Sequence, residues 1–473
     1  MEEYILTDKF KQFWLIAIIC SVAFMIQLDF TSLNISLAAL AKFFGVKVGM
    51  VAWLPTIYLL IITSMLLGFG KLGDIIGYQK VFLAGLVVFC LGAIACSVAP
   101  NFIALFLARA FQSLGLAMFS PICIAFLTYY LPANVRGRAL GLYATALGLG
   151  MTTGPALGGL ITSCLSWRGN FILGAVISLI IFIAGLILLP SKQEKASDSR
   201  FDYLGALLLF IGMVGFLFAL NTVAKAGWSH PKVLTGLILS PLAFVFFILR
   251  EKKVAYPLLD LTLFGNLNFT FAALAALFGL AMNIGMGFLF PFYLQMMIHL
   301  SVIQMGFLLM CSPIMLMLLS PITGSLSDYL GSRRLCMTGM GLAACAFLLF
   351  TFLTPQSSQW QIVLGLICMG TGMGFFIAPN NRLMMQNAPV DKQGVASGVY
   401  KIALNAGSSI GIASYMLVMS YVVIFDVSKM NIMLGSVRQH PEILLSGFRG
   451  AFIFGMVMAL ITFFFSFLAK DKK

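Results

Sequence analysis

The chain has 473 residues, of which 61% are hydrophobic and 9% are charged, and its mean hydropathy is +1.03. Soluble domains carry about 25% charged residues, so this composition excludes an ordinary soluble protein. The formal net charge of +14 comes from basic residues spread thinly over many short loops, which excludes a nucleic-acid-binding protein. The nine cysteines form no C-x-x-C pair and mostly fall within apolar runs, which disfavours metal sites and disulfides.

Apolar runs long enough to cross about 30 Å of hydrocarbon as helices recur along the whole chain. We therefore expect an all-α polytopic membrane protein with fourteen spans. In chain order they are residues 13–40, 50–70, 81–99, 101–125, 139–163, 170–190, 203–223, 233–250, 269–293, 304–322, 335–354, 361–380, 394–424 and 447–469. An even number puts both termini on one side, and lysine and arginine concentrate in the loops of that side, which predicts cytoplasmic termini.

An internal repeat divides the chain. GKLGDIIGYQK at 70–80 and GSLSDYLGSRR at 324–334 share the pattern G-x-L-x-D-x-x-G-x-x-[KR], and each follows the second span of a six-span half. Repeated bundles with a central site are a common transporter architecture. We expect a six-helix bundle at 1–190, two additional transmembrane helices with linkers at 191–260, and a second six-helix bundle at 261–473.

The first span contains a buried acid. In the stretch IQLDFTSLNISL, residues 26–37, Asp29 lies at membrane depth, where an ionised carboxylate costs about 2.5–3.5 kcal/mol. Of the fifteen acidic residues it is the one deep in an apolar span, and the three histidines fall in predicted outer loops. Burial raises the proton affinity of a carboxylate and a neighbouring cation lowers it, so Asp29 is a candidate for reversible protonation. The alternative is a structural carboxylate fixed in an ion pair.

The polar residues of the first span form two sets on opposite helical faces: Asp29, Ser32 and Ser36, and Gln27, Thr31 and Asn34. One face can line a cavity while the other bonds to neighbouring helices, and the sequence does not decide between them. We favour the face of Asp29 for proton coupling and keep Asn34 as a substrate or structural contact.

Two further spans carry distinctive patterns. Arg109 lies within the fourth span with Gln112 and Ser113 on nearly the same face, and arginine stays charged at any working pH. In the fifth span glycine recurs at every fourth position, at Gly150, Gly154 and Gly158, and Pro155 follows the second of these glycines. Such a ridge permits close helix approach and the proline permits a bend. It suits a seal that opens on one side, and simple tight packing is the alternative; Gly407 and Gly411 repeat the spacing.

Polar or aromatic residues in otherwise apolar spans are the candidates for a substrate cavity: Asn34, Tyr58, Gln112, Asn283, Tyr293, Tyr400 and Asn405. The alternative for each is a packing contact whose polar group is satisfied within the protein.

Six motifs, taken in order, resemble the fourteen-span drug:proton antiporter branch of the major facilitator superfamily. They are LDFTSLN in the first span, AWLPTIYLL and GKLGDIIG around the second, ARAFQSLG at 108–115, GLGMTTGPALGG at 148–159 and SWRGNF at 166–171. The resemblance implies a contact between Asp29 and Arg109 that serves proton coupling; the alternative for Arg109 is a link between helices. It also implies a gating role for the glycine ridge with Pro155 and for the repeated loops through Gly70, Asp74, Gly77, Asp328, Arg333 and Arg334. The first loop departs from the family pattern at Ile75, Tyr78 and Gln79 and keeps Lys80.

We therefore expect a proton-coupled exporter of small, lipophilic, monocationic or neutral compounds that works by alternating access between two bundles. The alternatives are an exporter dedicated to one endogenous metabolite such as a siderophore, a membrane enzyme or flippase, and a sensor that transports nothing. No phosphate-binding G-x-x-x-x-G-K-[ST] motif is present, so we expect a proton gradient rather than ATP as the driving force, and no cofactor, metal or enzymatic activity. The expected partners are the substrate, protons and the lipid bilayer, with no nucleic acid, for a monomer in a bacterial inner membrane.

Overall fold

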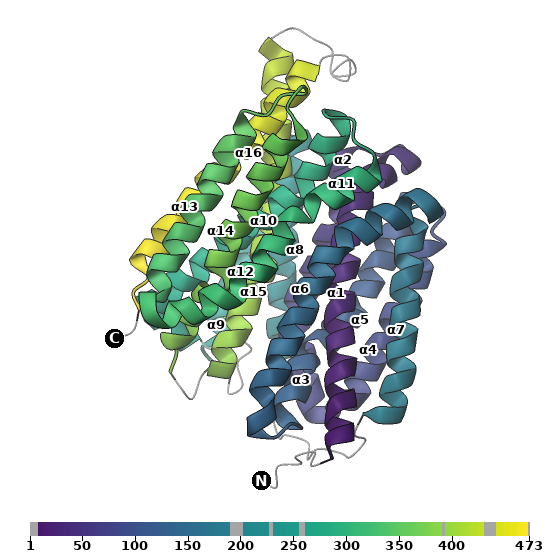
Figure 1. Ribbon diagram of the computed structural model, residues 1–473, viewed down its shortest axis with the longest axis vertical. Helices are drawn as coiled ribbons and strands as arrows, with labels where there is room; N and C mark the ends of the chain where they lie inside the picture. The colour runs from purple at the N-terminus through teal and green to yellow at the C-terminus, as the bar shows by residue number, and fades with distance from the viewer. Residues whose placement is uncertain are drawn as a thin grey trace. The chain divides into compact units, whose positions relative to one another are not determined.

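The computed structural model describes residues 8–189, 202–226, 230–254, 261–389, 393–429 and 441–471, and the regular structure within these ranges is entirely helical (Figure 1). The first half contains α1 (Lys9–Phe44), α2 (Val48–Val51), α3 (Trp53–Ile76), α4 (Tyr78–Ser97), α5 (Phe102–Tyr129), α6 (Ala133–Leu165) and α7 (Arg168–Leu188). The middle contains α8 (Tyr203–Ala226), α9 (Pro231–Glu251) and the short 3-10 helix η1 (Leu261–Gly265). The second half contains α10 (Leu267–Met296), α11 (Val302–Leu309), α12 (Cys311–Leu330), α13 (Ser332–Thr351), α14 (Gln359–Gln386), α15 (Gln393–Lys429) and α16 (Pro441–Leu468).

The expected all-α membrane architecture is confirmed. Each predicted span falls on a helix, although two of them are interrupted, at Ala52 between α2 and α3 and at Met310 between α11 and α12. Within the described ranges, 11 helical stretches are long and apolar enough to cross a membrane. Outward-facing side chains of α7 such as Ile180 and Ile187 are 61% and 74% exposed, which suits contact with lipid.

The repeated loop motif has the same backbone form in both copies. Gly77 ends α3 and precedes α4 with φ of 99°, and Gly331 ends α12 and precedes α13 with φ of 82°. Positive φ favours glycine because it has no Cβ atom. These two glycines occupy the same place in the aligned motifs, so the repeat in the sequence is also a repeat of structure.

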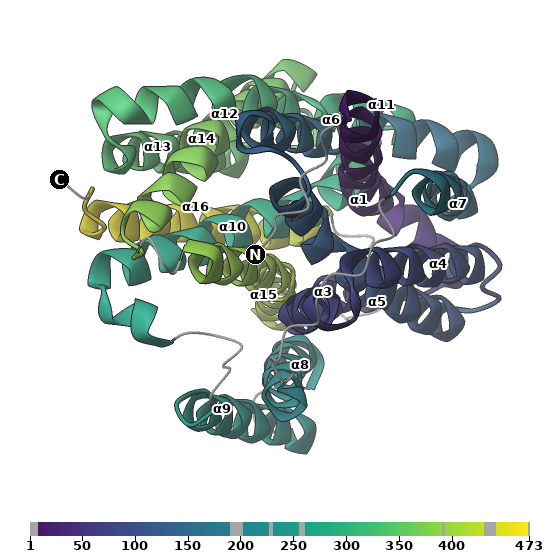
Figure 2. The same ribbon diagram turned by 90° about the horizontal axis from the view of Figure 1, so that it is seen from below.

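Two compact units make up the chain. The first holds α1 to α7 and the start of α8; in it α6 packs along α1, α5 packs against α3 and α4, and α4 lies between α5 and α7 (Figure 2). The second holds the rest of α8, α9 and α10 to α16; in it α15 packs along α10, α14 against α12 and α13, and α16 against α10 and α13. The pairing of helices is therefore the same in both units.

The two additional helices belong mainly to the second unit. Ala219 and Val223 of α8 form a small buried cluster with Val233 of α9, and Leu417 of α15 packs against it. The predicted domain boundaries at 190/191 and at 260 lie outside the described residues, so they stay predictions.

Candidate functional site

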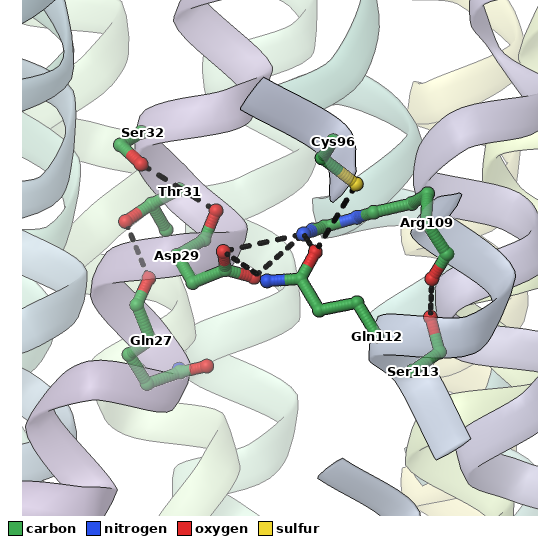
Figure 3. Close-up of polar contacts among 8 residues, drawn as sticks. All are labelled: Gln27, Asp29, Thr31, Ser32, Cys96, Arg109, Gln112 and Ser113. Carbon is green, nitrogen blue, oxygen red and sulfur yellow. Dashed lines mark hydrogen bonds and ion pairs between the residues drawn. The ribbon is translucent and has the colours of Figure 1, made fainter. Parts of the chain in front are cut away.

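Three side chains from two helices of the first unit meet in a buried polar cluster (Figure 3). Nη1 of Arg109 donates hydrogen bonds to both carboxylate oxygens of Asp29, at 2.9 Å to Oδ2 and 3.2 Å to Oδ1. The same nitrogen donates to Oε1 of Gln112 at 2.7 Å, and Nε2 of Gln112 donates to Oδ1 of Asp29 at 3.2 Å. Arg109 and Gln112 are 0% exposed and Asp29 is 6% exposed, so the ion pair is removed from solvent.

The helices around the cluster fix its geometry. Arg109 and Gln112 are three residues apart on α5 and therefore project from one face of the helix. Gly92 of α4 lets that helix approach closely, because a Cβ atom there would lie 2.5 Å from the Cα atom of Gln112. Sγ of Cys96, also on α4, lies 3.8 Å from Oε1 of Gln112. Gly174 of α7 faces Oδ1 of Asp29, at 3.6 Å from where its Cβ atom would be.

Two aromatic rings complete the surroundings of the guanidinium. Cζ of Arg109 lies 4.1 Å from the ring centroid of Tyr58 on α3 and 5.7 Å from that of Phe171 on α7. Tyr58 is fully buried, and its ring stacks on Phe30 with centroids 6.0 Å apart and an interplanar angle of 21°. Within the described part of the chain, Nε and Nη2 of Arg109 and the hydroxyl of Tyr58 have no hydrogen-bond partner.

The face of the first span that carries Asp29 packs within the unit. Asp29, Ser32 and Ser36 are all buried. Towards the end of α1, Nδ2 of Asn170 on α7 donates at 2.8 Å to the hydroxyls of both Ser36 and Thr162, which are themselves 2.7 Å apart. This face therefore binds α1 to α6 and α7.

The opposite face of the span is less buried. Gln27, Thr31 and Asn34 are half-buried, and the Thr31 hydroxyl donates to the main-chain oxygen of Gln27 at 2.6 Å. Oδ1 of Asn34 is buried without a hydrogen-bond partner among the described residues, so Asn34 keeps an unused acceptor.

The predicted glycine ridge of α6 lies directly on α1. A Cβ atom at Gly150 would meet the main-chain oxygen of Phe24, and one at Gly154 would meet the Thr31 hydroxyl. At Gly158 it would lie 2.6 Å from Cα of Ser32. α6 continues as a helix past the buried Pro155. In the second unit, Gly407 and Gly411 of α15 make the equivalent approach to the main chain of α10.

The repeated loops are described in part. Gly70 would place a Cβ atom 3.5 Å from Cβ of Pro121 on α5, and Gly77 has open space around it. The side chains of Asp74 and Asp328 lie outside the described part of the structure. Arg334 is exposed.

Asp471, which the sequence motifs did not single out, caps the helix that follows the second copy of the loop. Asp471 accepts hydrogen bonds from the main-chain N–H groups of Ser332 at 3.0 Å and Arg333 at 3.3 Å, at the start of α13. The guanidinium of Arg333 lies 4.6 Å from the ring of Phe467. The signal was present as an acidic residue just after the last apolar run, but the sequence does not show which helix end it reaches.

The remaining cavity candidates are scattered. Tyr293 and Tyr400 are buried and donate to main-chain oxygens, at 3.3 Å to Thr354 and 3.2 Å to Ile377, as the packing alternative expects. Asn283 of α10 and Asn405 of α15 are half-buried. Tyr58 and Gln112 belong to the Asp29–Arg109 cluster.

Comparisons with known proteins show the superfamily that the motifs resemble. The model of the Major Facilitator Superfamily matches residues 19–412. The riboflavin transporter RibZ of Clostridioides difficile (strain 630) is 30% identical over 406 residues, which cover 86% of this chain and 88% of RibZ. The multidrug resistance protein Stp of Mycobacterium tuberculosis (strain CDC 1551 / Oshkosh) is 28% identical over 392 residues, 82% of this chain and 72% of Stp.

A solved structure shares the fold. The crystal structure of a bacterial homologue of the human lysosomal transporter Spinster, inward-facing and unoccupied, superposes with a TM-score of 0.68 at 16% identity. The match covers 98% of this chain and 97% of that one.

Proposed function

The chain belongs to the Major Facilitator Superfamily, a family of membrane transporters, and from this premise we propose that it is a proton-coupled exporter. In this proposal it belongs to the fourteen-span drug:proton antiporter branch and moves small, lipophilic, monocationic or neutral compounds out of the cell. It works as a monomer by alternating access in the bacterial inner membrane, with both termini cytoplasmic. The proton gradient is the driving force, without a cofactor.

The observation that carries this proposal is the buried Asp29–Arg109 pair. A carboxylate at membrane depth is rare and marks ion or proton pathways. Arg109 stays charged throughout, so Asp29 is the member of the pair that can change its charge by taking up a proton. Protonation removes the attraction that joins α1 to α5, and α1 also carries the close contact with the glycine ridge of α6. Protonation of Asp29 therefore weakens a contact of α1, the helix that would move against α6 during alternating access.

The proposal is tested in inside-out membrane vesicles with an imposed proton gradient and ethidium as a monocationic probe. Asp29→Asn keeps the shape and one acceptor oxygen but removes the charge and the titrating group, so we expect gradient-driven ethidium uptake to fall to the level of vesicles without the protein. The matched control is Asp202→Asn, which alters a buried carboxylate that accepts from Gly205 N–H at the start of α8. It should transport like the unmodified protein. Full proton-driven transport by Asp29→Asn would refute the proposal.

A second candidate function is transport of one dedicated metabolite. The similarity to a riboflavin transporter over 86% of this chain favours a flavin as that metabolite. Riboflavin is neutral, and Asp29, which would attract a cation, is already compensated by Arg109. Competition decides between the two functions, because a multidrug exporter transports ethidium with and without riboflavin, whereas a dedicated carrier moves riboflavin and leaves ethidium in place.

A further inference from the structure

Arg109 needs compensation whenever Asp29 is neutral. Its side chain is completely buried, and among the described residues all of its hydrogen bonds are made by Nη1, two of them to the carboxylate of Asp29. Protonation of Asp29 leaves a full positive charge in a water-excluded site, and an unpaired buried charge is strongly destabilising. Gln112 offers one neutral acceptor to the same nitrogen.

The side chains that face the guanidinium from the surrounding helices offer little else. Asp29 comes from α1, Gln112 from α5, and Cys96 from α4, where its thiol contacts the oxygen of Gln112 rather than the arginine. Among the described residues, Tyr58 of α3 is the remaining titratable group at the cluster. From α7 the contribution is the ring of Phe171.

We propose that Tyr58 is a positioning residue whose ring face holds the Arg109 guanidinium in place while Asp29 is protonated, with Phe171 as a weaker second ring. The face of an aromatic ring carries partial negative charge and attracts a cation within about 6 Å of its centroid, most strongly where water is excluded. Both rings meet that distance, and Tyr58 meets it closely. With Asp29 ionised, the carboxylate compensates most of the charge of the guanidinium, so the ring contributes more to its stabilisation once Asp29 is neutral. The inference rests on the proposed protonation of Asp29, and it adds which side chains hold the Arg109 guanidinium in its position during that step.

The ring rather than the hydroxyl carries this role. The Tyr58 hydroxyl lies close enough to the Asp29 carboxylate to interact with it, but it completes no hydrogen bond within the part of the chain that the structure describes. The phenylalanine variant therefore separates the ring from the hydroxyl. Stacking on Phe30 fixes the orientation of the ring from its other side. Phenylalanine at position 58 keeps the ring face, whereas leucine is apolar but smaller and loses the attraction for the cation.

A double-mutant cycle tests the inference without any substrate. Asp29→Asn mimics the neutral carboxyl, so Tyr58→Leu is introduced both into the unmodified chain and into Asp29→Asn, and unfolding of the purified full-length protein is followed by SDS titration. We expect Tyr58→Leu to raise the unfolding equilibrium constant about tenfold more in the Asp29→Asn background. Tyr58→Phe should restore the parent stability in both backgrounds.

The matched control is Tyr415→Leu in the second unit. Tyr415 is also fully buried, its hydroxyl has no hydrogen-bond partner among the described residues, and its ring contacts that of Phe454. Tyr415→Leu should change the unfolding equilibrium constant by the same factor in the unmodified chain and in Asp29→Asn. Failure to recover folded Asp29→Asn/Tyr58→Leu, when Asp29→Asn/Tyr415→Leu folds, is the same coupling in stronger form. Additive effects of Tyr58→Leu, or a Phe variant as unstable as Leu, overturn the inference, whereas the vesicle assay of Asp29→Asn alone decides the proposed function.

Discussion

The contact between α6 and α1 allows a sharp test of the glycine ridge. In Gly158→Ala the new Cβ atom would lie 2.6 Å from Cα, 2.7 Å from Cβ and 2.9 Å from the main-chain oxygen of Ser32. Two of these atoms are backbone, so no rotamer change relieves the clash, and the helices must separate. Overpacking of this kind costs about 1–3 kcal/mol. For a unit of about this size each kcal/mol lowers Tm by roughly 2–4 °C.

The matched control lies on the same helix. A Cβ atom at Gly141 of α6 would meet nothing within 4 Å. Gly141→Ala should leave Tm unchanged or raise it slightly, because alanine favours helix over glycine by up to about 1 kcal/mol. The assay is thermal unfolding of the purified full-length protein in detergent. A Gly158→Ala protein as stable as Gly141→Ala would show that the α1–α6 contact is looser than described.

A second pair of variants checks the mechanism of this loss. At Gly154 the obstacle is the side chain of Thr31 rather than backbone. Thr31→Ala removes the hydroxyl that a new Cβ atom would meet first, so it should recover part of the stability lost in Gly154→Ala. No such rescue is expected from a side-chain change opposite Gly158.

The same variants separate a gate from simple packing. If the ridge only packs, Gly158→Ala should transport normally per folded molecule at temperatures below its Tm. If the ridge is a seal that must slide or open, transport per folded molecule should fall while the protein remains folded. Ethidium uptake in vesicles, normalised to folded protein, distinguishes the two interpretations.

Other contacts give further expected outcomes. Arg109→Gln leaves the buried Asp29 carboxylate unpaired and should cost about 3–5 kcal/mol, whereas Asp29→Asn/Arg109→Gln should cost less than that single change; SDS titration measures both. Asp471→Ala removes the cap of α13 and should cost about 0.5–2 kcal/mol in the same assay, while Lys470→Ala, whose recorded hydrogen bonds are main-chain, should be near neutral. Asn170→Ala should lower the free energy of unfolding by about 1–3 kcal/mol, and Tm with it, since it removes one buried and one partly buried hydrogen bond between helices.

The positions of the helices could be predicted from the sequence because a membrane permits few backbone conformations. A backbone in hydrocarbon must satisfy its own hydrogen bonds, so a long apolar run becomes a helix, and hydropathy locates it. The interruptions at Ala52 and Met310 each lie three residues before a proline, Pro55 and Pro313, which has no N–H to bond the carbonyl four residues earlier, where α2 and α11 end. That signal was present in the sequence, but many other prolines of this chain lie inside unbroken helices, so it did not predict these breaks. The repeated motif succeeded where it depended on backbone conformation, at Gly77 and Gly331.

The site was accessible from the sequence only in part. The motifs implied the contact of Asp29 with Arg109, two residues 80 positions apart, and the structure contains it. The positions of Tyr58 and Phe171 around the guanidinium depend on how α3 and α7 are rotated about their axes. These helices are apolar on all sides, so no hydrophobic stripe fixes that rotation in the sequence. Their role becomes visible only once the helices are packed.

The charge of the cluster leads to a last prediction about the driving force. With Asp29 ionised, the pair with Arg109 has no net charge, and one proton makes it +1. In the proposed exchange, one proton that enters for one monocation that leaves moves no net charge across the membrane. The same proton exchanged for a neutral molecule moves one charge inward, which is worth about 2.3 kcal/mol per 100 mV.

A membrane potential imposed without a pH gradient should therefore separate the two substrate types. In inside-out vesicles, a lumen-positive potassium diffusion potential should accelerate riboflavin uptake, if riboflavin is a substrate, and should leave carrier-mediated ethidium uptake unchanged. Vesicles with Asp29→Asn give the passive movement of each probe under the same potential, which is subtracted. Equal responses would mean that both cycles move the same net charge, so the monocation would have to exchange for one proton more than the neutral molecule does. A single carboxylate carries one proton per cycle for either substrate, so this result would contradict the proposed exchange.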